Sequence, residues 1–254
     1  MSRIIIASNP TTKKASISKN IPQIKIAEFF SRTVQGESIT TGFPSAFLRT
    51  KNCTLNCTWC DSASVWRYGD SYSIPEIIDL MEKSELIDDL KKGHHLILTG
   101  GSPLMQQEAF VVLLTTIYQK HEFIPFIEVE NECVLDVKWE FSQYIAQWNN
   151  SPKLENSGMK KQLRYKPEVI KQAARFKNSW FKFVISEEKD WQEIVTDYLE
   201  PELIQRNQIV LMPCGSTREE LLQTQGMVVD MAIRESVIFS NRSHVQLWDK
   251  MTGV

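Results

Sequence analysis

Three cysteines stand within eight residues, in the run Cys53-Thr-Leu-Asn-Cys57-Thr-Trp-Cys60-Asp61. Closely spaced thiolates in proteins hold zinc or iron-sulfur clusters. A zinc site normally completes its tetrahedron from a second CxxC or HxxxH pair, and no such pair follows nearby. A disulfide loop or a group of reduced thiols is the alternative, but cysteines are scarce elsewhere in the chain and disulfides are rare inside cells. The run therefore favours an iron-sulfur cluster with one iron open to another ligand.

The spacing C-x3-C-x2-C, with Trp59 just before the last cysteine, resembles the signature of radical S-adenosylmethionine (SAM) enzymes. In that superfamily a Gly-Gly-Glu-Pro segment after a strand binds the amino group of the methionine moiety. The matching segment here is Thr99-Gly100-Gly101-Ser102-Pro103, in which Ser102 replaces the glutamate. Its glycines would let a ligand approach the backbone closely. A hydroxyl and backbone carbonyls then remain to accept the hydrogen bonds.

A closer resemblance runs from about residue 24 to residue 248. Gln35-Gly36-Glu37 precedes Gly42-Phe43-Pro44 and Arg49, which stands shortly before the cysteines. The later segments that carry it are Glu128, Ser151-Pro152-Lys153, Phe181-Lys182-Phe183-Val184, Leu211-Met212-Pro213 with Gly215, and Arg242-x-His244-x-Gln-x-Trp248. In these segments the chain is similar to the 7-carboxy-7-deazaguanine synthases.

That resemblance implies a homodimer of incomplete barrels that uses a 4Fe-4S cluster, SAM and Mg²⁺. The substrate would be 6-carboxy-5,6,7,8-tetrahydropterin, rearranged to 7-carboxy-7-deazaguanine with loss of ammonia for deazapurine (queuosine) synthesis. An electron donor such as flavodoxin or ferredoxin would be a partner. Cys53, Cys57 and Cys60 would hold the cluster, and Ser62 stands where the family has a threonine whose hydroxyl binds Mg²⁺.

The resemblance also implies two sets of binding residues. The SAM set comprises Trp59, Asp61, Thr99, Gly100, Gly101, Ser102, Ser151 and Lys153. The substrate set comprises Gln35, Glu37, Arg49, Glu128 and His244. A pterin has a flat edge of donors and acceptors plus a carboxylate, which suits amide and carboxylate side chains and a bidentate arginine. Glu130 lies two residues after Glu128, on the same strand face, and is a rival for its role.

Two alternatives stay open on the sequence. One is another small radical SAM enzyme, such as an activase that places a glycyl radical on a partner protein. The other is a non-enzymatic module that binds zinc or senses redox state through the three cysteines. The remaining cysteines, Cys133 and Cys214, are expected to be free thiols without a role.

The elements that must position these residues alternate along the chain. Hydrophobic patterns and turn signals predict strands at 46–50, 95–99, 123–129, 144–148, 180–185 and 209–212. They predict helices at 73–91, 106–119, 167–176, 187–198 and 217–236. Such alternation indicates a parallel sheet, and about six βα units are fewer than the eight of a closed barrel. We therefore expect an α/β fold, an incomplete TIM-type barrel of the radical SAM kind.

Composition agrees with one catalytic domain. The chain has 254 residues, of which 42% are hydrophobic, and we expect a loosely ordered arm over 1–23 followed by a single domain over 24–254. A net charge of −2 disfavours direct binding to nucleic acid. No apolar stretch reaches the roughly 18 residues that span a bilayer, and the first residues lack a signal-peptide core. The sequence thus predicts a soluble, cytoplasmic protein that does not bind membranes.

Overall fold

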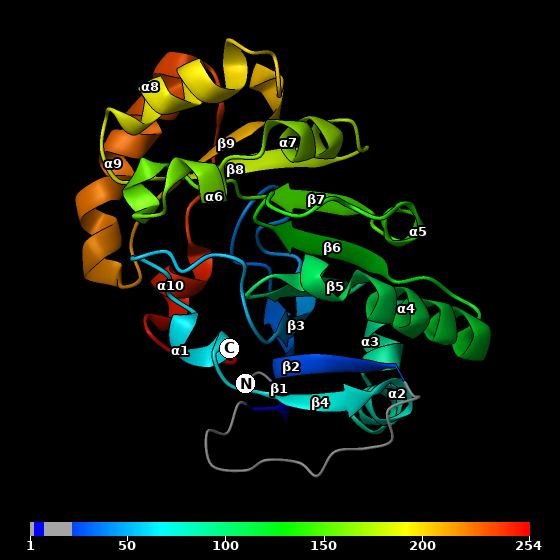
Figure 1. Cartoon of the computed structure of the whole chain (residues 1–254). Helices are drawn as coiled ribbons and strands as arrows, with labels where there is room; N and C mark the ends of the chain where they lie inside the picture. Colours follow the sequence, from blue (N-terminus) through cyan, green and yellow to red (C-terminus); the bar gives the residue numbers. More distant parts are fainter. Residues whose placement is uncertain (1–2, 8–21) are drawn as a thin grey trace.

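The computed structural model describes residues 3–7 and 22–254 (Figure 1). Its strands are β1 (Arg3–Ile6), β2 (Gln23–Val34), β3 (Pro44–Thr50), β4 (Asp70–Ser73), β5 (His95–Gly100), β6 (Phe126–Asn131), β7 (Gln147–Asn150), β8 (Ser179–Ile185), β9 (Ile209–Pro213) and β10 (Ile238–Phe239). Its α-helices are α1 (Ala63–Trp66), α2 (Ile74–Lys83), α3 (Leu86–Lys91), α4 (Gln107–His121), α5 (Trp139–Ser142), α6 (Lys161–Arg164), α7 (Pro167–Ala174), α8 (Asp190–Ile194), α9 (Arg218–Glu235) and α10 (Ser243–Trp248). Short helical turns are η1 (Pro103–Gln106), η2 (Glu155–Ser157), η3 (Val195–Leu199) and η4 (Arg206–Gln208). None of the described helices is long and apolar enough to cross a membrane.

The strands form one mixed, curved sheet. Within the described residues their order is β1-β2-β3-β5-β6-β7-β8-β9-β10, and β4 also pairs with β2. From β3 to β10 every neighbouring pair is parallel, whereas β1, β3 and β4 pair with β2 antiparallel. Helices such as α4, α7 and α9 cover the outside of the curve (Figure 1). No pairing joins β10 to β1 in the described parts of the chain, so the predicted incomplete barrel is confirmed.

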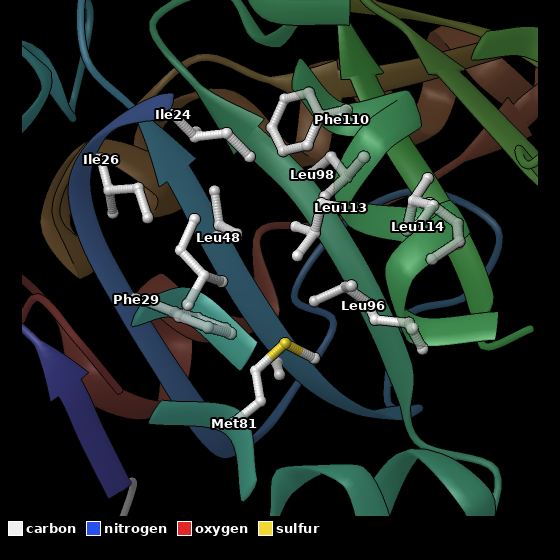
Figure 2. Close-up of a cluster of buried hydrophobic side chains, with 14 of the residues drawn as sticks. Ile24, Ile26, Phe29, Leu48, Met81, Leu96, Leu98, Phe110, Leu113 and Leu114 are labelled. Carbon is white, nitrogen blue, oxygen red and sulfur yellow. The ribbon is translucent and has the colours of Figure 1, made fainter. Parts of the chain in front are cut away.

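Alternation along each strand separates an apolar face from a polar face. On the outer face, Leu48 of β3 and Leu96 and Leu98 of β5 pack with Phe110 and Leu113 of α4 (Figure 2). Burial of each such side chain contributes about 1.5–3 kcal/mol to the free energy of folding. The residues between them on β3 and β5 therefore face the inside of the curve, where Phe47 and Ile97 pack together and Arg49 and Thr99 line a cavity at the strand ends.

Sequence signals mark the start of α2 and the break that ends it. Ser73 caps the helix by accepting a hydrogen bond from Glu76 N, and the Glu76 carboxylate accepts one from Ser73 N at 2.8 Å, as the predicted capping box requires. The prediction of one helix over 73–91 is wrong, because Ser84 ends α2 and Glu85 takes a left-handed conformation (φ 60°) before α3. The turn lets the apolar faces of both helices stay against the sheet.

Other boundaries also differ from the sequence prediction. Residues 3–6 of the expected loose arm form β1, which pairs antiparallel with β2, and residues 8–21 of that arm lie outside the described residues. Strand β6 begins at Phe126 instead of residue 123, and β7 runs from Gln147 to Asn150 instead of 144–148. These shifts do not change which strand follows which, so the predicted series of βα units holds.

Candidate active site

A cavity of about 570 Å³ lies at the carboxyl ends of the parallel strands. Strands β3, β5, β6 and β8 contribute Arg49, Thr99, Glu130 and Lys182 to its wall. The sequence-predicted residues that line it are Gln35, Glu37, Arg49, Cys53, Cys57, Trp59, Cys60, Asp61, Ser62, Thr99, Gly100, Gly101, Ser151, Lys153 and His244. Ser102 and Glu128 are fully buried and lie outside this wall. The structure thus brings together nearly all the residues that the sequence singled out.

The cysteine loop (residues 51–62) leaves the end of β3 and forms one side of the cavity. Its three cysteines, Cys53, Cys57 and Cys60, all line the cavity as unpaired thiols. A backbone hydrogen bond of 3.0 Å from Asn52 N to Trp66 O ties the start of the loop to α1. Since the loop is anchored, the three sulfurs are presented to the cavity from one short segment.

Polar contacts at the sulfurs fit the binding of an iron-sulfur cluster. Trp66 Nε1 donates to Cys60 Sγ and Leu55 N donates to Cys53 Sγ, both at 3.4 Å. Such N–H donors stabilise charge on cluster sulfurs and tune cluster potentials. Burial raises the pKa of the Cys53 thiol to about 11, so bound iron must supply the positive charge that keeps it a thiolate. Three thiols with these donors match a cluster that leaves one iron open.

The two glycines after β5 serve a close approach of backbones. A Cβ on Gly100 would lie 2.3 Å from Thr50 N, and one on Gly101 would lie 1.8 Å from Asn52 O. Gly100 also has a φ of +138°, which side chains rarely adopt. The end of β5 can therefore run directly beside the first residues of the cysteine loop, where Ser102 N donates to Asn52 O at 2.8 Å.

Trp59, Ser151 and Lys153 form a second group in the cavity wall. Lys153 Nζ donates to Ser151 Oγ at 2.7 Å and lies 5.6 Å from the centre of the Trp59 ring. The Trp59 indole is oriented by a hydrogen bond of 3.2 Å to Asn156 Oδ1. An aromatic face, a hydroxyl and a lysine can together hold a ligand that carries both a flat ring and a carboxylate.

Glu128 does not face the cavity, which corrects the role expected for it. Its carboxylate is fully buried and lies within 2.6 Å of His95 Nδ1, 2.7 Å of Thr40 Oγ1 and 2.7 Å of Asn149 Nδ2. Successive residues on one strand face lie about 6.5 Å apart, which places Glu128 one layer further from the strand end than its rival Glu130. Glu130, by contrast, lines the cavity.

Arg49 and Glu130 make up the polar wall at the ends of β3 and β6. Arg49 Nε donates to Glu28 Oε1 at 2.8 Å, and Thr99 Oγ1 donates to Glu130. Burial opposes the charged guanidinium, but the carboxylates of Glu28, Glu130 and Asp61 raise the pKa of Arg49 above its ordinary value. Arg49 is therefore a permanent cation in the cavity wall.

A network of charged side chains closes another wall. Arg242 Nε donates to Glu37 Oε1 at 3.0 Å, Arg242 Nη2 pairs with Asp61, and Lys182 Nζ pairs with Glu37. Burial alone would raise the pKa of Glu37, but the charges of Lys182 and Arg242 outweigh it and hold that pKa well below its usual range. Ligand atoms of Glu37, Asp61 and His244 lie within 4.8 Å of one another. Because the two basic side chains already balance both carboxylates, the cluster is an ion-pair network.

The end of the chain completes this wall. His244 packs directly on Gly36, where a Cβ would lie 2.3 Å from the imidazole Nδ1, and Ser243 N donates to Gly36 O at 2.8 Å. Burial lowers the pKa of His244, which favours a neutral imidazole. Residues 249–254 also line the cavity.

Sequence reasoning did not assign roles to Lys182 and Arg242, although both stand in segments that it singled out. Lys182 interrupts the apolar strand Ser179–Ile185. Alternation along the strand places it on the inner face of the sheet, so the sequence alone could have indicated a lysine in the cavity wall. Arg242 carries no local signal, because its carboxylate partner Glu37 lies 205 residues away.

Comparisons with known proteins agree with this site. The family described as "4Fe-4S single cluster domain" matches residues 34–149. A 7-carboxy-7-deazaguanine synthase of Pyrobaculum aerophilum is 27% identical over 234 residues, which cover 91% of this chain and 98% of that protein. One of Halobacterium salinarum is 27% identical and covers 95% of this chain and 97% of that protein. The crystal structure of QueE from Escherichia coli has the same fold, with a TM-score of 0.62, 18% identity, and coverage of 87% of this chain and 95% of that one.

These similarities extend along almost the whole chain, and they coincide with the three-cysteine loop and the cavity beside it. Along almost its whole length the chain is therefore similar to proteins named 7-carboxy-7-deazaguanine synthase, and it shares the fold of QueE.

Proposed function

We propose that this protein is a radical SAM enzyme that converts 6-carboxy-5,6,7,8-tetrahydropterin to 7-carboxy-7-deazaguanine with loss of ammonia, in deazapurine biosynthesis. One observation carries the proposal: a single cavity holds the cysteine loop, the group formed by Trp59, Ser151 and Lys153, and a polar wall that includes Arg49 and Glu130. Such a cavity has room and partners for a cluster, SAM and a small acidic heterocycle.

Cys53, Cys57 and Cys60 would hold the 4Fe-4S cluster, with one iron open to SAM. When bound, the cluster and SAM supply one-electron chemistry and hydrogen abstraction, and the protein supplies position and exclusion of water. Lys153, with Ser151 beside it, would bind the SAM carboxylate, and the backbone around Trp59 would lie against the adenine. Gly101 would flank the methionine moiety.

Arg49 would bind the substrate carboxylate. Of its five N–H donors, Nε is used by Glu28, and in the described residues no hydrogen bond is recorded for the other four. Glu130 would accept hydrogen bonds from the pterin edge, in place of Glu128, and Gln35 would contribute its amide. His244, neutral because burial lowers its pKa, could donate or accept a hydrogen bond at the substrate.

Magnesium and two partners belong to the same proposal. Ser62 lines the cavity, and its hydroxyl would be a protein ligand of Mg²⁺, which in proteins usually keeps several waters and adds substrate oxygens. The one-electron step needs a donor of the flavodoxin or ferredoxin kind. A homodimer is the expected assembly.

The decisive experiment is an anaerobic assay of the reconstituted enzyme with SAM, Mg²⁺, reductant and carboxytetrahydropterin, read by mass spectrometry. We expect carboxydeazaguanine to form. SAM cleavage without that product would point to another substrate, as an activase would show. Colourless protein with stoichiometric zinc would instead rule out the cluster.

Three variants separate the proposed roles. Cys57→Ala should lose cluster absorbance and iron. Arg49→Ala should retain both and mainly raise the KM for the pterin. Cys214→Ala is the matched control, because this half-buried free cysteine does not line the cavity, and it should keep cluster and activity. Equal loss of iron in the Cys57 and Arg49 variants would contradict the assignment.

A further inference from the structure

Glu132 is a carboxylate in the cavity wall that the roles above do not use. It directly follows β6 (Phe126–Asn131) and lines the cavity, yet its side chain is only 5% exposed. A carboxylate buried to this extent normally has a cation or several donors at both oxygens. What surrounds its two oxygens therefore bears on its role.

One oxygen of Glu132 is held by two hydroxyls. Ser102 Oγ donates to Oε1 at 2.6 Å, and Thr54 Oγ1 donates to the same atom at 2.7 Å. Thr54 follows Cys53 in the cysteine loop, and Ser102 follows Gly101 after β5. The carboxylate is thus positioned where these two segments meet, beside the first cluster cysteine.

The other oxygen, Oε2, is buried and has no hydrogen-bond partner among the described residues. No ion pair to Glu132 is found within that part of the chain either. A buried carboxylate oxygen without a hydrogen-bond partner costs folding free energy. The two hydroxyls that donate to Oε1 nevertheless hold the carboxylate group in one orientation. This arrangement is complementary to a ligand that brings an N–H donor to the corner next to Cys53.

We propose that Glu132 Oε2 accepts a hydrogen bond from the amino group of the methionine moiety of SAM. The carboxylate comes from the end of β6, while Ser102, the residue after the two glycines, holds it in place from the end of β5. This inference rests on the proposed use of SAM. The inference also accounts for the serine at position 102. Ser102 carries no carboxylate, but its hydroxyl donates a hydrogen bond to the carboxylate of Glu132.

The test compares two ligands on the anaerobically reconstituted holoenzyme by calorimetry. S-adenosylhomocysteine carries the same amino and carboxylate groups and is not cleaved, and its deamino counterpart has hydrogen in place of the amino group. The dissociation constant of the deamino ligand divided by that of S-adenosylhomocysteine measures the contribution of the amino group to binding. In Glu132→Gln we expect this ratio to fall roughly 10- to 100-fold, as expected for a lost hydrogen bond to a charged group, with iron content and the unfolding midpoint unchanged.

Two further variants make the test specific. Glu130→Gln, the matched control, removes a neighbouring cavity carboxylate and should leave the ratio as in the wild type. The double variant Ser102→Glu with Glu132→Ser moves the carboxylate to the other segment and should restore the ratio to within about threefold, roughly 0.65 kcal/mol. If Glu132→Gln loses iron or does not fold, the iron-loaded double variant decides in its place.

An unchanged ratio in folded, iron-loaded Glu132→Gln would overturn the inference, and so would an equal fall in the Glu130→Gln control. The proposed function is judged separately, because these binding measurements need no pterin. Wild-type enzyme that shows the Glu132-dependent ratio but makes no carboxydeazaguanine would refute the proposed substrate and keep the contact. Formation of carboxydeazaguanine by the wild-type enzyme, together with an unchanged ratio in Glu132→Gln, would support the proposed substrate and refute the contact.

Discussion

Glu37 joins two buried cations, Lys182 and Arg242, and within the described residues only Arg242 forms a salt bridge with a second carboxylate, that of Asp61. The side chains of all three are 5–12% exposed, so each charge depends on its partners and not on water. Removing one member of a buried pair typically costs 3–5 kcal/mol, because it leaves an uncompensated charge. Arg242 keeps Asp61, so Lys182 would bear most of this penalty.

We predict that Glu37→Gln lowers the free energy of unfolding by about 3–5 kcal/mol at neutral pH. Because the folded pKa of Glu37 is lowered, its stabilisation is complete above the unfolded pKa of about 4.3 and is lost as the pH falls through the folded value. The difference between wild type and variant should therefore be constant above about pH 5.5 and shrink in more acidic solution.

Anaerobic urea unfolding of both proteins from pH 7 to pH 3.5 checks this. Glu188→Gln is the control, since Glu188 pairs with Arg234 on the surface with a side chain that is 57% exposed, and it should change stability by less than about 1 kcal/mol. A difference for Glu37→Gln that persists unchanged at pH 3.5 would refute the assignment.

At this scale the sequence grouped Cys53, Cys57 and Cys60 by their local spacing, and in the structure all three line one cavity. The sequence analysis preferred Glu128 to Glu130 as a substrate-binding residue. Both lie on the same face of β6 and differ only in their distance from the strand end, which a single sequence does not relate to the cavity. Glu132 was not singled out, since its partners Thr54 and Ser102 come from two other segments. The spacing of neighbouring residues could therefore be interpreted from the sequence, whereas the position of a side chain relative to the cavity and the contacts between distant segments could not.

At the scale of elements, the end of β5 and the cysteine loop are locked backbone to backbone. Gly101 N donates to Thr50 O at 3.1 Å, and its α-carbon faces Asn52 O. A methyl group at Gly101 would push the two segments apart, because a backbone carbonyl cannot move aside as a flexible side chain can. The three cysteines would then be displaced together.

We predict that Gly101→Ala greatly reduces iron incorporation, with a loss of stability of about 1–3 kcal/mol for overpacking. Iron analysis and absorbance after reconstitution measure this. Gly226→Ala is the control, because nothing lies within 4 Å of a Cβ at that position in helix α9, and alanine should stabilise the helix by up to about 1 kcal/mol. Full iron loading in Gly101→Ala would show that the loop can shift independently of β5.

The sequence predicted the order of strands and helices better than their ends. Apolar runs and capping signals identified α2, α4 and β8, whereas the break at Glu85 rests on a left-handed residue that carries no glycine signal. The antiparallel β1 and β4 were not predicted, because they pair with different halves of the long strand β2, each far from its partner in the sequence. Strand pairing at a sheet edge is set by tertiary contacts.

For the whole molecule, segments from the first quarter of the chain and from its last fifteen residues meet in one site. Ser38 N donates to Ser240 Oγ at 2.7 Å, and Arg242 reaches Glu37 and Asp61. The segment from Ser240 onward therefore forms one wall of the cavity, and its Arg242 supplies the counter-charge for the buried carboxylate of Glu37 and for the more exposed one of Asp61.

Two shortened chains should behave differently. A chain that ends at Asn241 lacks Arg242 and should lose about 3–5 kcal/mol of unfolding free energy, because Glu37 and Asp61 lose their shared cation. A chain that ends at Trp248 keeps Arg242 and loses the hydrogen bond of 3.1 Å from Arg218 N to Asp249, which is worth about 0.5–1.5 kcal/mol. Denaturant unfolding of both chains measures this, and equal stability would contradict the role given to Arg242.

The separation of 205 positions between Glu37 and Arg242 also sets an order of events during synthesis. At 5–20 residues per second, a ribosome needs roughly 10–40 s to add Arg242 after Glu37. The cysteine loop is made early in that interval, before the last wall exists. The nascent protein therefore contains its cysteine loop before the wall that Arg242 helps to form has been synthesised.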